Sequence, residues 1–173
     1  RELYGVDELS DQTIAKVQEG YDKVRRPGFY KEILHEKANI LSCQVNRVEG
    51  TPFKESDMPT FLMQDLSIVR MYHDPDIKTF TKPTGIEVKS LGGWHRVIDW
   101  WCDKYAKYAV AVKSQDGYNR DINYEKVPAE KVEKAFLKKL QDDPLTAEEK
   151  KNLEDHLFWY AADKATENNL PVK

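Results

Sequence analysis

Four side chains in the middle of the chain could bind an anionic substrate. Lys113 directly follows a short apolar run, Tyr118 and Arg120 come shortly after it, and Arg70 follows an earlier apolar run. Ammonium, phenol and guanidinium groups all donate hydrogen bonds, and a guanidinium can hold a carboxylate through two parallel bonds. Each residue also has a structural interpretation: a lysine at a strand exit, a packed tyrosine or a surface arginine. For Lys113 the pattern alone favours the structural interpretation.

The elements around Lys113 indicate why chemistry is expected there. Small and β-branched residues at 109–112 predict a short strand buried on both faces. An amphipathic helix is predicted over 94–107, and a second helix begins at Pro128. Helix, buried strand, polar loop and helix form the pattern of a parallel sheet, in which ligands bind beyond the carboxyl ends of the strands. We therefore expect Lys113 and the loop to Arg120 to lie at such an end.

Other segments follow familiar rules. Apolar residues at three- and four-residue spacing predict a helix from Ile14 to Val24 and a second, short helix over 29–37. A strand is predicted over 39–46. Residues 61–63 are either a strand or part of a longer irregular one, and 80–93 is predicted to be a loop. Thr146 and Glu149 form a capping-box pattern before the last helix. Leu170–Lys173 is predicted to start another strand.

Composition places the chain among globular proteins of one domain. It has 173 residues, of which 40% are hydrophobic and 33% charged. The net charge of −3 gives no general attraction to nucleic acid or to an anionic membrane, so neither is expected as a partner. No signal peptide is visible, which favours the cytoplasm. Cys43 and Cys102 have no metal-site spacing, so two buried free thiols are expected, with one disulfide as the alternative.

Common catalytic motifs are absent from the sequence. It contains no GxGxxG, P-loop, GxSxG or HExxH pattern. The four histidines are scattered, and only His73 lies in a polar turn, beside Asp74 and Asp76. These three residues could hold a metal ion, but Asp-Pro turns are common and the pattern does not favour that interpretation.

Three stretches together are similar to one family, the amidohydrolase-related metal-dependent hydrolases. The first is Leu3-Tyr-Gly-Val6 with Tyr21, Pro27-Gly28, a helix and Ala38-Asn-Ile. The second is Ala109-Val-Ala-Val-Lys-Ser114 with Tyr118-Asn-Arg120. The third is His156-Leu with Ala165 and Asn169-Leu-Pro-Val172. The resemblance covers most of the chain in the right order.

The resemblance implies an α/β fold and a portion of a (β/α)8 TIM barrel. Residues 1–173 would form a single partial barrel domain with roughly strands 2 to 4, and 1–37 would be a helical, insertion-like part. Members of the family hold a divalent metal through a His-x-His pair and further histidines, and zinc is the metal chiefly expected. The sequence has no His-x-His pair, so the resemblance places the metal ligands outside these residues. The expected partners are a small-molecule substrate and the remainder of the barrel, with a homo-oligomer as a further expectation.

In the family, the metal supplies an activated water that attacks a carbonyl or similar carbon. Some members also use a carboxylated lysine from the fourth strand, where Lys113 would lie. The resemblance thus makes Lys113 such a carboxylated lysine, a substrate-facing one or a salt-bridged one. It makes Arg70, Tyr118 and Arg120 candidates for contact with substrate.

A different class of function is the alternative. The chain could be a non-catalytic α/β binding or interaction domain, with the aromatic-rich segment 94–108 facing a partner. Against this, tryptophans at helical spacing usually belong to a core. We therefore predict that they are buried.

Overall fold

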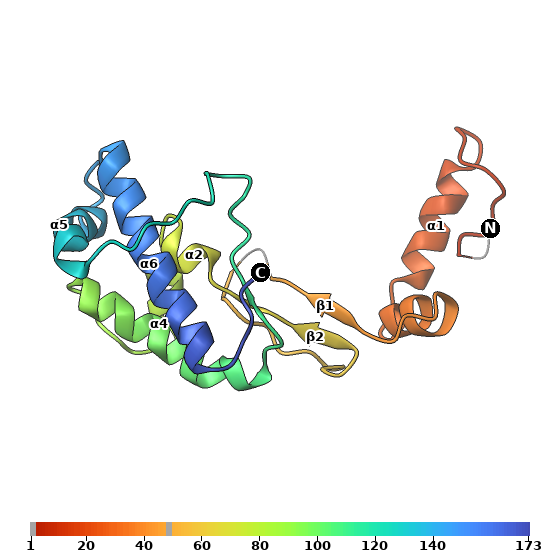
Figure 1. Ribbon diagram of the computed structural model, residues 1–173. Coiled ribbons are helices and arrows are strands. Elements are labelled where there is room, and N and C mark those ends of the chain that lie inside the picture. Colours follow the sequence, from red (N-terminus) through yellow and green to blue (C-terminus); the bar gives the residue numbers. More distant parts are fainter. Residues whose placement is uncertain (1–2, 48–49) are drawn as a thin grey trace. The chain divides into compact units, whose positions relative to one another are not determined.

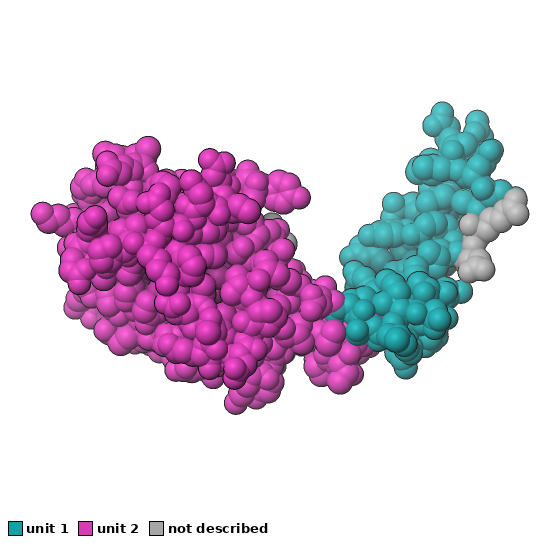
Figure 2. All heavy atoms as spheres, viewed as in Figure 1, with its two compact units in different colours: residues 1–43 teal, residues 44–173 magenta. Residues whose placement is uncertain are grey.

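The computed structural model describes residues 3–47 and 50–173 (Figure 1). The chain divides into two compact units, Arg1–Cys43 and Gln44–Lys173, which are coloured separately in Figure 2. Each unit is described by itself below. The fold combines helices with small parallel sheets and is therefore α/β, as predicted.

The N-terminal unit is helical. The predicted first helix is α1 (Ile14–Val24), and the predicted second one is a π-helical segment, η1 (Lys31–Lys37). No residue of α1 is buried, so its apolar stripe covers no core within this unit. Gly20 allows the chain to pass close to α1, since a Cβ there would lie 2.8 Å from the Cα of Tyr4.

Parallel pairing organises the C-terminal unit. Strands β1 (Cys43–Val45) and β2 (Leu62–Gln64) form one two-stranded sheet. Strands β3 (Leu66–Ser67) and β4 (Val112–Lys113) form another, which is parallel and pairs Leu66 with Val112.

The end of the chain adds a further extended segment beside β4. Val172 forms a parallel bridge with Val112, and backbone bonds join Val112 to Pro171 and Lys173. The prediction of an extended segment over 170–173 is therefore confirmed. The three paired segments lie side by side in the order in which the chain reaches them.

The strand predicted over 109–112 lies slightly later in the chain. Tyr108 ends a short 3-10 turn, η2 (Ala106–Tyr108), and regular pairing is confined to β4. Ala111 and Val112 are buried as predicted, whereas Ala109 and Val110 are half-buried. Residues 109–111 lie between this turn and β4.

Three longer helices cover the unit: α4 (Leu91–Tyr105), α5 (Ala129–Leu140) and α6 (Ala147–Glu167). The capping box at Thr146 and Glu149 is confirmed, with both reciprocal bonds formed. Within residues 3–47 and 50–173, no helix has the length and apolar character needed to cross a bilayer.

The prediction of a loop over 80–93 is wrong at both ends. Helix α4 begins before Trp94 because the Ser90 hydroxyl accepts a bond from the Gly93 N–H at 3.2 Å. Helix α3 (Ile77–Thr81) includes Phe80, and the Asp76 carboxylate caps it at Thr79. Helix α2 (Val69–Tyr72) was likewise not predicted, since its four residues are too few to show a helical period.

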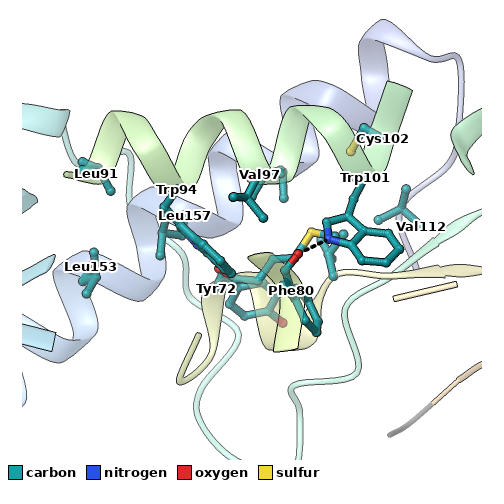
Figure 3. Packing of buried hydrophobic residues seen from close by; sticks show 14 of the residues in the cluster. Tyr72, Phe80, Leu91, Trp94, Val97, Trp101, Cys102, Val112, Leu153 and Leu157 are labelled. Atoms are coloured by element: carbon teal, nitrogen blue, oxygen red, sulfur yellow. Dashed lines mark hydrogen bonds between the residues drawn. The ribbon is translucent and has the colours of Figure 1, made fainter. Parts of the chain in front are cut away.

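The tryptophans of α4 belong to the core, as predicted. Trp94 and Trp101 are buried among residues of α2, α3 and α6 (Figure 3). Their indole N–H groups donate to backbone carbonyls, Trp94 to Met71 at 2.8 Å and Trp101 to Phe80 at 3.0 Å. This satisfies the only polar atom of each ring. These two side chains are therefore not available to a partner.

The two cysteines are free thiols. Cys102 is buried, and this burial raises the pKa of its thiol to about 12. Cys43 is only half-buried, so the expectation of two buried cysteines is wrong for this residue.

A histidine pair joins α4 to α6. Nε2 of His95 lies 3.0 Å from Nε2 of His156, whose Nδ1 lies 2.7 Å from the carbonyl of Val127. Since a carbonyl only accepts, His156 carries its proton on Nδ1 and its Nε2 accepts from His95. Burial and the neighbouring His156 lower the pKa of His95 to about 4.

We expect this pair to make folding sensitive to mild acid. The pKa of His95 is lower in the folded chain than in the unfolded one, so its contribution is complete above about pH 6.5 and disappears as the pH falls toward 4. After discounting for partial exposure, the loss is about 1 to 2 kcal/mol. Urea unfolding at several pH values should show wild type losing that much more stability than His95→Gln. If the free energy of unfolding depends on pH in the same way in both proteins, the prediction for His95 is wrong.

Candidate functional site

Polar residues gather beyond the carboxyl ends of β3 and β4. Helix α2 follows β3 and leads to His73, and the loop after β4 carries Asp116. The hydroxyl of Tyr72 joins the two regions by donating to the carbonyl of Ser114 at 3.0 Å. Burial, followed by the bond to Tyr124, raises the pKa of Tyr72 well above its usual range. This phenol therefore stays a hydrogen-bond donor.

Lys113 lies on the sheet face turned away from the buried aliphatic residues. Side chains alternate along a strand, and Leu66 and Val112 point into the core. Ser67 and Lys113 are register partners on the opposite face, and Lys173 lies beside Lys113. These three residues are called the polar row below. Lys113 is half-buried, and its ammonium forms no ion pair within residues 3–47 and 50–173. Lys113 is the last residue of β4, so its predicted position at the end of a strand is confirmed.

Lys173 shows how polar this face is. Its ammonium lies 2.8 Å from Oδ2 of Asp65 and also contacts the side-chain oxygen of Gln44. Asp65 is almost completely buried, and neither of its carboxylate oxygens has a well-directed hydrogen bond. The ion pair with Lys173 is therefore the main compensation for its charge. This leaves Lys113 as the cation of the row with no partner among the described residues.

Arg120 is held inside a network of carboxylates. It donates to Oε2 of Glu154 at 3.0 Å and to Oδ1 of Asp155 at 2.5 Å, and Asp116 lies 3.9 Å away. Burial alone would lower the pKa of Arg120, but its pairs with Asp155 and Glu154 raise it. Its guanidinium also lies over the Tyr124 ring. Its donors are thus directed at the protein's own carboxylates and, from Nε, at the Asp121 carbonyl at 3.1 Å.

The other two predicted substrate contacts lie apart from this network. Tyr118 is 95% exposed, and Arg70 is a surface residue paired with Asp74 at 3.6 Å. The structure brings neither of them to Lys113 or to Arg120 by a direct contact.

His73 has other partners than the sequence pattern indicated. Its Nδ1 lies 3.2 Å from Oε1 of Glu154 and 3.5 Å from Oδ1 of Asp116. Asp74 instead pairs with Lys139 and Arg70, which lower its pKa, and Asp76 caps α3. The suggested His73–Asp74–Asp76 metal site is therefore not formed.

Glu154 and Asp155 were not predicted as part of a site. A signal for Glu154 was present in the sequence, because it is a charged residue at core spacing in α6, three residues before the buried Leu157. Its partner Arg120 comes from a loop far away in the sequence, which no periodic pattern reveals.

A metal ion finds no ready ligand set here. Among the described residues, no group of three or more histidine, cysteine, aspartate or glutamate side chains is arranged to hold one.

Comparison with known proteins adds no relative to this picture. The sequence matches no protein-family model and no curated protein.

Proposed function

We propose that the chain forms part of the wall of a (β/α)-barrel hydrolase of the amidohydrolase type, acting on a small molecule. The observation that carries the proposal is the order of the paired segments. β3, β4 and Val172 are parallel neighbours in chain order, with α4 crossing between the first two and α5 and α6 before the third. Such winding in one direction is the construction of a (β/α) barrel, and each half of a doubly wound sheet is built in the same way.

The polar row supports the same proposal. In a barrel, the face away from the helices lines the interior, and active sites lie at the carboxyl ends of the strands. Ser67 and Lys113 occupy the last paired positions of β3 and β4 on that face. An unpaired ammonium there is placed to bind an anionic group of a substrate.

The metal expected for such a hydrolase would have its ligands elsewhere. The described residues do not fit a metal site, so we propose no step in which they hold or activate one. The role that we assign to this chain is substrate binding, with Lys113 as the charged contact. Arg120 is excluded from that role by its bonds to Glu154 and Asp155.

The test is a comparison of two lysine variants in the active protein. Hydrolysis of a panel of carboxylate-bearing amides, esters and lactones is measured with added Zn²⁺. Lys113→Met should lower kcat/KM by about 10- to 100-fold, the loss of one charged hydrogen bond. Lys134→Met, which changes an exposed lysine of α5, should have no effect. Equal kcat/KM for both variants and wild type would remove Lys113 from the site.

A further inference from the structure

A cavity of about 300 Å³ lies beside the His73 network and is separate from the polar row. It lies between the turn after α2, the loop after β4 and the first turns of α6. Its lining includes His73, Glu154, Lys150, Asn119 and Asn123. This volume is at the lower end of the range for small-molecule sites.

The Nδ1 edge of the His73 ring faces two carboxylates. This nitrogen is buried and lies within 3.5 Å of one oxygen of Glu154 and one of Asp116, although it forms no well-directed hydrogen bond to either. Glu154 and Asp116 are only 4% and 1% exposed. The side chain of His73 keeps 18% of its surface accessible and lines the cavity, and since Nδ1 is buried, this accessible surface belongs to the rest of the side chain.

The surroundings of the two carboxylates favour a donor at Nδ1 of His73. Arg120 donates to the other oxygen of Glu154, and Tyr124 donates to the other oxygen of Asp116 at 3.1 Å. Both carboxylates thus accept hydrogen bonds on these other oxygens, while Oε1 of Glu154, which faces Nδ1, has no donor. A proton on Nδ1 leaves the lone pair on Nε2, at the cavity.

One cation of the cavity is free to meet an anion. Lys150 is largely exposed, and its contact with Glu154 is a long one, 3.8 Å. Lys151, by contrast, is held by Asp155 at 2.5 Å. A ligand in the cavity can therefore find an ammonium on one side and an imidazole lone pair on the other.

We propose that His73 is a proton acceptor of a second small-molecule site, and that this site takes a small anion bearing an O–H group. The anionic oxygens bind Lys150, and the O–H donates to Nε2 of His73. Transfer of that proton to Nε2 gives an imidazolium beside Glu154 and Asp116 and leaves the negative charge on the ligand oxygen. This arrangement of carboxylate, histidine and substrate hydroxyl is that of general base catalysis. The inference does not rest on the hydrolase proposal, because it uses none of the residues of the polar row.

The first test is the tautomer of His73, measured by long-range ¹H–¹⁵N NMR at pH 8 in the unmodified protein. The expected result is a proton on Nδ1 and none on Nε2. His73→Gln assigns the signals. A proton on Nε2, or on both nitrogens, would overturn the proposal.

The second test compares two inorganic anions at pH 7.5. Phosphate carries an O–H group and sulfate does not, so phosphate should shift the His73 signals saturably and sulfate should bind at least tenfold more weakly. Lys150→Met should abolish the phosphate response without changing the tautomer. The His95 signals, in the histidine pair, should not move. An equal response to both anions, or no response to phosphate, would refute the site.

Discussion

Replacing Arg120 by alanine should destabilise the unit formed by residues 44–173 by about 3 to 5 kcal/mol. Arg120 is the cation that Glu154 and Asp155 share, and both acids are buried. Without it, these carboxylates and the nearby Asp116 would face one another with no guanidinium between them. A buried charge that loses its partner costs far more than the pair contributes when intact.

Urea unfolding followed by far-UV circular dichroism measures this effect. Arg96→Ala is the matched control, because Arg96 is exposed and makes one 3.3 Å bond to the carbonyl of Gly92, so its loss should cost less than about 0.5 kcal/mol. The stability loss of Arg120→Lys should lie between those of Arg120→Ala and Arg96→Ala, because an ammonium keeps the charge but not the paired donors of a guanidinium. A loss below about 1 kcal/mol for Arg120→Ala would contradict the role of its guanidinium as the stabilising partner of these buried carboxylates.

The substitution Trp94→Ala should cost a similar amount, about 3 to 5 kcal/mol, for a different reason. Trp94 is 0% exposed, and its ring lies beside that of Phe80 with centroids 6.2 Å apart. Alanine would leave a cavity at the centre of the cluster shown in Figure 3 and an unsatisfied carbonyl at Met71. Since domains of this size are stable by about 5 to 15 kcal/mol, the variant should be close to unfolding.

The same helix offers the control. Trp100→Ala removes a ring that is half-buried and lies under the ammonium of Lys104, so it should cost roughly 1 kcal/mol. If Trp94→Ala does not fold, Trp94→Phe keeps most of the volume and gives a measurable urea midpoint. Equal costs for the two alanine variants would contradict the assignment of Trp94 to the core.

The parts of the fold that could be predicted from the sequence are those with a long periodic pattern. Helix α4 has its apolar residues at helical spacing, and the start of α6 is marked by the capping box of Thr146 and Glu149. Helices α2 and α3 have four and five residues, which is too short for a period to appear. Their existence depends on tertiary contacts, such as the bond from Trp94 to Met71.

The candidate site divides in the same way. The position of Lys113 follows from one local fact, the end of a buried strand, and was predictable. The bonds of Arg120 to Glu154 and Asp155 join residues 34 and 35 positions apart, and those of His73 link three segments of the chain. Such pairings depend on how α6 packs, which the order of residues does not reveal. The barrel itself remains a proposal for the same reason.

The segment between β4 and α5 limits which amino-acid substitutions this protein can accept during evolution. It contains no helix or strand, yet α6 holds it through Arg120, through the bond from the Glu125 N–H to Asp155 at 3.1 Å, and through that from Trp159 to the Tyr124 carbonyl at 3.2 Å. Its order is thus supplied by another element. Substitutions in this segment should therefore require matching substitutions in the facing turns of α6. We expect the two regions to vary together among homologous proteins.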